Sequence, residues 1–212
     1  IKDIGLIMTY TALDVKRTYR VGIAIAKDLY SEAPFRRIGV NKIAKNKDAV
    51  IFKNDGKLLV IHRPEKILRK TSIWMAKVNG SLSEWDNHKI ILSPKYQWEN
   101  KKIGLGPPLF EIDAGYLMLY HAVQKPKIYR VGAALLEKKN PFRVIARTKE
   151  PIMIPKEWYE KYLDTPYVVF PTGGFLVDDE LYIYYGSCDT VIALAKTNLT
   201  DILAILDRNT LD

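Results

Sequence analysis

A two-strand unit that occurs four times along the 212-residue chain limits the folds that this sequence can adopt. Each unit opens on a turn of Asp, Asn or Gly and continues as a short apolar strand that ends near a Tyr or a His. A loop then leads into a second strand of small and β-branched residues. The predicted first strands are 5–11, 56–62, 115–121 and 179–185. The predicted second strands are 20–26, 72–76, 130–136 and 191–195, and their ends lie 50, 60 and 59 residues apart.

This repeat length and strand content favour an all-β propeller in which each unit forms one blade. The strands are apolar along most of their length, as expected of strands that are buried on both faces. A third short strand is predicted at 35–38 and at 142–145, where two Phe-Arg segments are nearly alike. Four units fit either a complete four-bladed propeller or four blades of a five-bladed one. Helical signal is sparse: 155–163 is expected to form one or two turns, and 198–206 a helix or a closing strand.

The composition indicates one folded domain over residues 1–212 that stays out of membranes. Hydrophobic residues make up 48% of the chain and charged residues 27%, and no apolar run approaches the roughly 20 residues that span a bilayer. The single cysteine, Cys188, excludes an internal disulfide framework and favours a cytoplasmic protein. The net charge of +9 comes from scattered Lys and Arg, which predicts no nucleic-acid partner; a small anion such as phosphate is the better candidate.

Two charged stretches of the first half are candidate site residues. Lys47 and Asp48 open a predicted strand and either project into a site or form an ordinary charged turn. The second stretch is His62-Arg63-Pro64-Glu65 at a strand end. Its arginine either binds an anion through its planar fork of donors or forms a salt bridge with the following glutamate.

Two further stretches lie in the second half. Lys102 precedes a Gly-Pro turn and His121 ends the strand that follows, and this histidine is assigned the same repeat position as His62 and Tyr185. Asp189 lies between two apolar strands and is either a turn former or a carboxylate that faces a pocket. The three histidines have no ligand spacing and the chain has no nucleotide-binding glycine loop, so neither a metal nor a cofactor is expected.

Taken together, these motifs resemble glycoside hydrolase family 130, the β-mannoside phosphorylases and related β-1,2-mannosidases. The resemblance extends from Met8 to Ala195 and rests on the order of the following segments: Asn-Lys-Asp-Ala at 46–49, His-Arg-Pro at 62–64, Lys-Ile-Gly-Leu-Gly-Pro-Pro at 102–108, Tyr-His at 120–121, Tyr-Arg-Val-Gly-Ala-Ala at 129–134, Val-Val-Phe-Pro at 168–171, Tyr-Tyr-Gly at 184–186 and Asp-Thr-Val-Ile at 189–192.

The resemblance implies a five-bladed propeller that cleaves β-mannosides with inorganic phosphate and inverts the anomeric carbon, giving α-mannose 1-phosphate. It places four residues at phosphate-binding positions: Lys47, where many members have Arg, Arg63, Lys102 and His121. It assigns Asp48, Tyr129 and Asp189 to sugar hydroxyls. An inverting hydrolase needs a carboxylate base to activate water, whereas phosphate is already a nucleophile and needs cations that hold it. The retained cations therefore favour a phosphorylase over an inverting β-mannosidase, with phosphate as co-substrate.

The sequence departs from the family at the proton donor. The family's donor is the Asp of an Asp-Pro-Arg motif ahead of the strand that here is 6–10, and this chain contains no such motif. Asp3 does not match it, because Asp3-Ile4-Gly5 has the pattern of a turn that leads into the strand. We therefore assign no catalytic residue within the chain, and we expect the first blade and its general acid to lie upstream of Ile1.

The chain alone is expected to have little activity, because a general acid contributes about 10²–10⁴-fold. Two alternatives stay open. One is a non-catalytic propeller that binds sugar or phosphate, and the other is a homo-oligomer formed through an open sheet edge.

Overall fold

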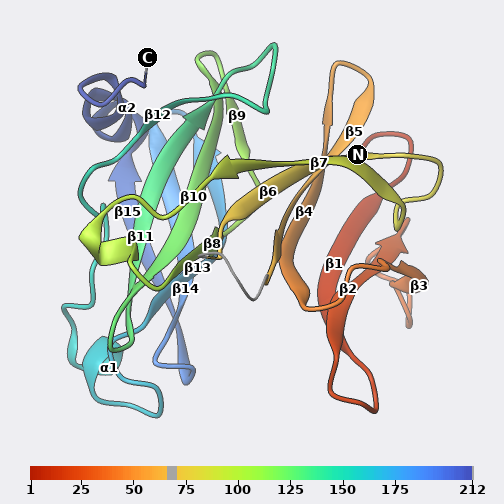
Figure 1. The fold of residues 1–212 in the computed structure, drawn as a ribbon, viewed down its shortest axis with the longest axis horizontal. Helices are drawn as coiled ribbons and strands as arrows, with labels where there is room; N and C mark the ends of the chain where they lie inside the picture. Colours follow the sequence, from red (N-terminus) through yellow and green to blue (C-terminus); the bar gives the residue numbers. More distant parts are fainter. Residues whose placement is uncertain (66–70, 212) are drawn as a thin grey trace. The chain divides into compact units, whose positions relative to one another are not determined.

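The computed structural model describes residues 1–65 and 71–211, and these form four antiparallel β-sheets with little helix, so the all-β prediction is confirmed. The chain divides into two compact units, residues 1–92 and residues 93–212, which are described separately (Figure 1). No helix among the described residues is long and apolar enough to cross a membrane.

Unit 1, residues 1–92, contains two sheets. The first has the strand order β1-β2-β3. Its strands are β1 (Leu6–Leu13), β2 (Tyr19–Ala26) and β3 (Arg36–Val40). The second sheet has the order β4-β5-β6-β7. Its strands are β4 (Asn46–Asn54), β5 (Lys57–Pro64), β6 (Ile73–Val78) and β7 (Trp85–Leu92). Buried aliphatic side chains of β2, β4, β5 and β6 form the core of this unit.

Unit 2, residues 93–212, contains the other two sheets. The order β12-β11-β10-β8 describes the third sheet, in which β9 also pairs with β10. Its strands are β8 (Lys102–Leu105), β9 (Phe110–Ile112), β10 (Gly115–Gln124), β11 (Ile128–Leu136) and β12 (Val144–Arg147). The fourth sheet has the order β13-β14-β15. Its strands are β13 (Val169–Val177), β14 (Glu180–Ser187) and β15 (Val191–Asn198).

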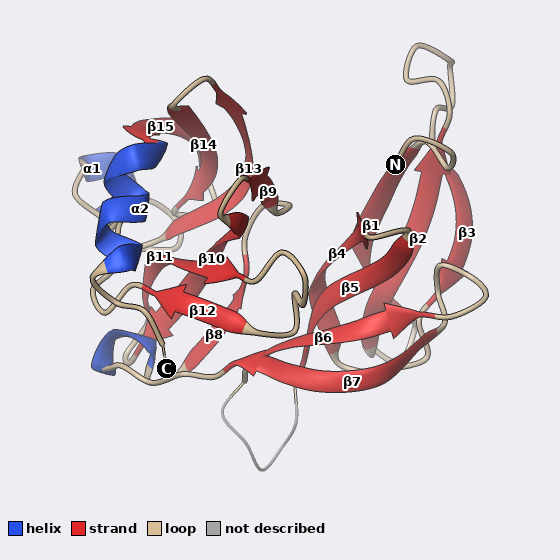
Figure 2. Cartoon of the chain, turned by 90° about the horizontal axis from the view of Figure 1, so that it is seen from above, coloured by secondary structure: helices blue, strands red, loops and turns tan. Residues whose placement is uncertain are grey.

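The described helical segments all belong to unit 2 and are short. They are the 3₁₀ turn η1 (Gln97–Glu99), α1 (Trp158–Lys161) and α2 (Leu199–Asp207). The one or two helical turns predicted within 155–163 are confirmed as the short helix α1, and the C-terminal segment is a helix rather than a strand. Figure 2 shows α2 beside the sheets of unit 2, where it contacts β11, β12 and β15. Its Ile202 and Leu206 are buried in the core that the third and fourth sheets share.

The four predicted repeats are four pairs of neighbouring antiparallel strands, each in a different sheet. The pairs are β1 with β2, β5 with β6, β10 with β11 and β14 with β15. In three of them a glycine with positive φ begins the unit: Gly5 at +98°, Gly56 at +74° and Gly115 at +143°. A Cβ at Gly115 would lie 2.1 Å from the Leu136 carbonyl oxygen, so the turn requires glycine there.

The same close contact between a tyrosine and a glycine occurs within the first sheet and again within the third sheet. Gly132 of β11 lies opposite Tyr120 of β10, as Gly22 of β2 lies opposite Tyr10 of β1. A Cβ at Gly132 would lie 2.4 Å from Cζ of Tyr120 and 2.7 Å from Cη2 of Trp98. The tyrosine ring therefore occupies the space above the glycine.

Gly132→Ala should lower the free energy of unfolding by about 1–3 kcal/mol, because the added methyl overlaps two buried rings. Gly186→Ala is the matched control: it also lies within a strand, and no described atom is within 4 Å of its Cβ position. The control should change stability by less than about 0.5 kcal/mol. Urea unfolding of both variants measures this, and equal effects would contradict the packing argument.

Candidate functional site

Three of the predicted site residues meet in unit 1. Lys47 of β4 lies opposite Arg63 of β5 in the strand register, and a bulge follows at once. Asp48 lies in that bulge with a φ of +51°, a conformation that non-glycine residues seldom adopt and that often occurs at functional sites. The bulge brings its carboxylate to Arg63, whose Nε donates to Asp48 Oδ2.

Arg63 is the centre of this cluster. Its side chain is only 1% exposed, and its Nη1 donates a second bond, 3.0 Å long, to Oε1 of Glu65. The salt bridge to Glu65, one of the two interpretations of this stretch, is therefore confirmed. A guanidinium has five N–H donors, so these two bonds leave three for other acceptors. The charges of Asp48 and Glu65 outweigh the effect of burial and raise the pKa of Arg63, which stays charged.

Tyr19 completes the cluster and was not among the predicted site residues. Its hydroxyl donates to Oε2 of Glu65, and Nζ of Lys47 lies 5.3 Å from the centre of its ring. Burial and the bond to Glu65 raise the pKa of Tyr19 to about 12. Burial acts to raise the pKa of Glu65, but the bond from Tyr19 and the charge of Arg63 outweigh burial and lower it. The carboxylate is thus ionised at neutral pH and holds Arg63 in place.

The segment before β1 offers no substitute for the missing proton donor. The carbonyl oxygen of Ile1 accepts from the backbone N–H groups of Ile4 and Gly5, at 3.0 and 2.9 Å, so the expected turn into the strand is confirmed. Asp3 lies in this turn with its side chain 78% exposed, and its Oδ2 is 3.4 Å from Nζ of Lys53. An exposed carboxylate paired with a surface lysine is not enclosed in a site where it could be held against a leaving group. The placement of the acid upstream of Ile1 stays a prediction.

Lys102, His121 and Tyr129 meet in unit 2. His121 of β10 is buried, and its Nδ1 lies 3.1 Å from the carbonyl oxygen of Leu105. Because a carbonyl only accepts, Nδ1 is the donor, which fixes the orientation of the ring. The Tyr129 ring stacks on His121 with centroids 6.1 Å apart, and Nζ of Lys102 lies 5.6 Å from the Tyr129 ring centre.

Phe170 of β13 closes this second cluster. Its ring centroid lies 4.4 Å from that of His121, closer than the tyrosine. The residue belongs to a Val-Val-Phe-Pro segment that the family resemblance includes, yet no role was predicted for it. An apolar strand position gives no signal of a ring contact, so only the structure reveals it.

The remaining predicted residue, Asp189, lies in the turn between β14 and β15. It and Cys188 have φ values of +54° and +49°, and Thr190 N donates to the Ser187 carbonyl across the turn. This confirms that Asp189 is a turn former. Its side chain is exposed, and its role toward sugar stays a prediction.

The repeat position assigned to His121 is corrected by the structure. In the fourth sheet the hydroxyl of Tyr185 donates to Glu160, which lies in α1 ahead of that sheet. In the third sheet the matching bond, to Glu99 in η1, comes from Tyr120 and not from His121. Adjacent residues of a strand point to opposite faces, so this one-residue error places the side chain on the wrong face of the sheet.

His62 is a buried histidine with a structural environment. Its Nδ1 lies 3.1 Å from Oδ1 of Asn46, its Nε2 lies 3.0 Å from Nδ1 of His88, and its ring is 5.3 Å from that of Trp85. Burial, with a smaller effect of His88, lowers the pKa of His62 to about 3. The ring is therefore neutral at physiological pH and does not add to the cationic groups.

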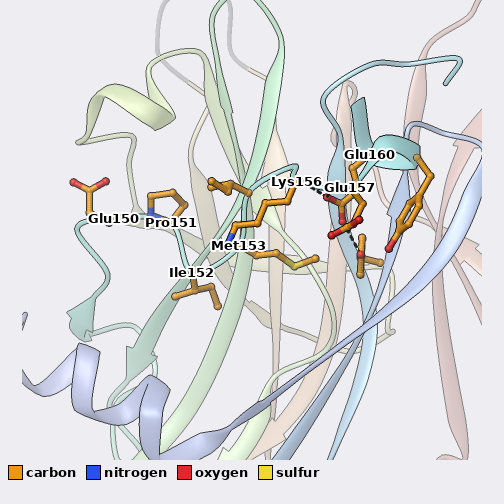
Figure 3. Close-up of a pocket in the computed structure, with 10 residues that line it drawn as sticks. Glu150, Pro151, Ile152, Met153, Lys156, Glu157 and Glu160 are labelled. Atoms are coloured by element: carbon orange, nitrogen blue, oxygen red, sulfur yellow. Dashed lines mark hydrogen bonds between the residues drawn. The ribbon is translucent and has the colours of Figure 1, made fainter. Parts of the chain in front are cut away.

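Two cavities among the described residues lie away from the predicted site residues. One in unit 2 has a volume of about 510 Å³ and lies beside α1 (Figure 3), and one in unit 1 has about 310 Å³ and lies beside Trp85. None of the seven predicted site residues lines either of them. Among residues 1–65 and 71–211, no three His, Cys, Asp or Glu side chains gather as a metal site.

Comparison with known proteins adds the family to this geometry. A family model described as beta-1,4-mannooligosaccharide phosphorylase matches residues 3–208. The chain belongs to glycoside hydrolase family 130. The resemblance inferred from the ordered motifs is therefore confirmed.

Individual relatives of family 130 agree. The 1,2-beta-oligomannan phosphorylase of Thermoanaerobacter sp. (strain X514) is 40% identical over 187 residues, which cover 87% of this chain and 60% of the relative. The beta-1,4-mannooligosaccharide phosphorylase of Ruminococcus albus is 30% identical over 166 residues, covering 74% of this chain and 50% of the relative.

A solved structure shows the same fold. The beta-1,2-mannobiose phosphorylase from Listeria innocua, in complex with beta-1,2-mannobiose, superposes with a TM-score of 0.88 at 30% identity. The match covers 98% of this chain and 59% of that one. The chain thus spans about half to three fifths of the length of these relatives.

The pH dependence of stability should depend on His62. Its folded pKa of about 3 is lower than the ordinary 6.5, so between these values the unfolded chain binds a proton that the folded chain does not. Stability should therefore fall as the pH drops from 6.5 toward 3, by an amount on the order of a few kcal/mol.

Urea unfolding between pH 7.5 and 4 measures this loss, and His62→Phe should show a smaller one. The His62 imidazole should also stay neutral at pH 5 in NMR spectra. A titration of that ring near pH 6.5 would refute the prediction.

Proposed function

We propose that this chain forms most of a β-mannoside phosphorylase that transfers mannose from a β-mannoside to inorganic phosphate with inversion, giving α-mannose 1-phosphate. Membership of family 130 supports this, as do relatives named as phosphorylases. The observation that carries the proposal is the cluster around Arg63, a buried guanidinium held by two carboxylates and flanked by Lys47. Such a group binds an oxyanion with little loss of conformational entropy.

Phosphate needs cations rather than a carboxylate base, since it is already a nucleophile. On the family resemblance we assign four residues to phosphate: Lys47, Arg63, Lys102 and His121. The Lys102 and His121 side chains share the Tyr129 ring as a neighbour, which limits their motion. Nδ1 of His121 donates to a backbone carbonyl, so we assign Nε2 to phosphate, to which it donates when the ring carries both protons.

Sugar hydroxyls are assigned to Asp48, Tyr129 and Asp189. Asp48 then has two roles, because the carboxylate that orients Arg63 would also accept from a hydroxyl. No cofactor or metal is invoked for this reaction. The chain has no Asp-Pro-Arg, so we propose that the proton donor is supplied by residues upstream of Ile1.

Several finer assignments rest on the same comparison. We propose that the four sheets are blades of a five-bladed propeller, which their repeated strand pairs support. The higher identity to the β-1,2-oligomannan phosphorylase, 40% against 30% for the β-1,4 relative, favours a β-1,2-mannoside as substrate. A buried single Cys188 suits a cytoplasmic protein. Assembly through an open sheet edge stays a prediction.

The full-length protein that carries this sequence should release mannose 1-phosphate from β-1,2-mannobiose only when phosphate is present. ³¹P NMR detects that product directly. Equal release of free mannose with and without phosphate would instead identify a mannosidase. Absence of any turnover, with mannose and phosphate still bound in calorimetry, would identify a binding protein.

Arg63→Lys should lower kcat/KM for phosphate by about 10–100-fold, because a charge-assisted bond contributes about 1.5–3 kcal/mol. Lysine keeps the positive charge but lacks the planar guanidinium, whose separate N–H groups donate to Asp48 and Glu65 and leave others for phosphate. Arg143→Lys is the matched control, since its side chain is 56% exposed and outside both clusters. Unchanged kinetics for Arg63→Lys would refute its assignment to phosphate.

A further inference from the structure

A six-residue motif, Pro-Lys-x-x-x-Glu, occurs at 94–99 and again at 155–160. The two copies are 61 residues apart, which matches the repeat length of the sheets. Each copy precedes the first strand of a sheet in unit 2 and contains a short helical turn, η1 in the first and α1 in the second. In both copies the final glutamate is almost fully buried, with Glu99 0% and Glu160 3% exposed.

In the first copy, the buried carboxylate of Glu99 has four donors. Its Oε2 accepts from two backbone N–H groups of its own turn, at 2.7 and 3.0 Å. Its Oε1 accepts from the hydroxyl of Tyr120 at 2.8 Å and also from Nη2 of Arg147. Nη1 of the same arginine donates to the carbonyl oxygen of Ser93 at 2.9 Å. The guanidinium of Arg147 thus neutralises a carboxylate that would be costly to bury alone.

The second copy repeats these bonds atom for atom, except for the arginine. Oε2 of Glu160 accepts from the backbone N–H groups of Lys156 and Glu157, at 2.5 and 2.8 Å. Its Oε1 accepts from the hydroxyl of Tyr185 at 2.7 Å. Within the described residues, Glu160 forms no ion pair with any arginine or lysine.

A cavity occupies the corresponding place. The cavity of about 510 Å³ in unit 2 is lined by Ile154, Glu160 and Tyr185, among others. These three residues match Ser93, Glu99 and Tyr120, the groups that contact the Arg147 guanidinium in the first copy. Glu160 lies at one end of the cavity in Figure 3, and the Lys156 side chain runs from there toward Met153.

The lining of this cavity is also more acidic than the first copy. Glu157 replaces Tyr96, whose ring lies 5.1 Å from the guanidinium carbon of Arg147. Glu150 lines the cavity as well. Three carboxylates and the Lys156 side chain therefore line this cavity, and two of the carboxylates, Glu157 and Glu160, lie in the motif whose first copy holds one planar cation.

We propose that this cavity is a binding site for a guanidinium group, with Glu160 as its anionic partner and the Ile154 carbonyl and Tyr185 hydroxyl as its neighbours. None of the seven residues assigned to phosphate and sugar lines this cavity. The group is supplied either by a small guanidino compound or by an arginine on an added β-strand. In the first copy the arginine comes from β12, the strand that pairs with β11. In the fourth sheet the counterpart of β11 is β15. Among the described residues β15 pairs with β14 alone, so its other edge has no strand in the position of β12.

Calorimetric titration of the full chain tests the site with three probes. The first is N-acetyl-arginine methylamide and the second is its lysine analogue. The third is an acetylated and amidated peptide with the sequence of residues 142–148, which contains the arginine of the first copy. The arginine probe should bind at least several-fold more tightly than the lysine probe, because a planar fork matches a carboxylate and a carbonyl together.

Glu160→Gln should weaken binding of the arginine probe at least tenfold. Glu157→Gln should weaken binding of the arginine probe less than Glu160→Gln does. If Glu160→Gln does not fold, Glu157→Gln is the variant that tests the site. Glu111→Gln removes one exposed negative charge from the same unit and should leave binding unchanged. A peptide that binds more tightly than the small probe, and loses this advantage when its second arginine is replaced by alanine, identifies a strand as the source.

Equal binding of peptide and small arginine probe identifies a free guanidino compound. No binding of any probe would overturn the proposal. So would equal binding of the arginine and lysine probes, or an affinity that neither Glu160→Gln nor Glu157→Gln changes.

Discussion

Unit 2 depends on the buried carboxylate of Glu99, which connects the turn before the third sheet to an inner strand of that sheet. Glu99 satisfies two backbone N–H groups of its own turn and accepts from Tyr120 in the middle of the third sheet. The tyrosine ring can lie flat enough to reach it only because Gly132 has no side chain. Burial raises the pKa of Tyr120, so its hydroxyl remains a donor. One buried carboxyl group therefore fixes a turn, a ring and two strands, and leaving it without partners would cost several kcal/mol.

The cluster around Arg63 uses the same physics for a different purpose. Here the buried group is the cation, and two carboxylates hold it from either side, one of them on a strained bulge at Asp48. The carboxylate of Glu99 accepts from four donors, which fills its hydrogen-bonding capacity, whereas the guanidinium of Arg63 has donors beyond its two bonds. A cation that is fixed in place, yet still able to donate, is suited to an oxyanion that arrives and leaves. This difference separates a structural ion pair from a candidate binding group.

The repeated strand pairs could be predicted from the sequence because each is a local pattern: a turn residue, an apolar run, a loop and a second run. The salt bridge between Arg63 and Glu65 could be foreseen for the same reason, since the residues are two apart. The bond from Tyr19 to Glu65 joins residues 46 apart with no periodic relation, and no pattern predicts it. The Pro-Lys-x-x-x-Glu motif could be recognised in the sequence, because its two copies are 61 residues apart and this spacing follows the repeat length. Its structural role could not be predicted, because that role depends on which tyrosine and arginine contact the glutamate.

The error in the repeat position of His121 shows where such patterns fail. Apolar strands that are buried on both faces carry no alternation, so nothing in the sequence distinguishes one register from the next. The hydroxyl bonds of Tyr120 and Tyr185 fix that register, and they place His121 on the opposite face of β10. Its assignment to phosphate therefore cannot rest on symmetry with Tyr185. It rests instead on what that face provides: a backbone carbonyl that orients the imidazole, the Tyr129 and Phe170 rings that hold it, and Lys102 beside the same tyrosine.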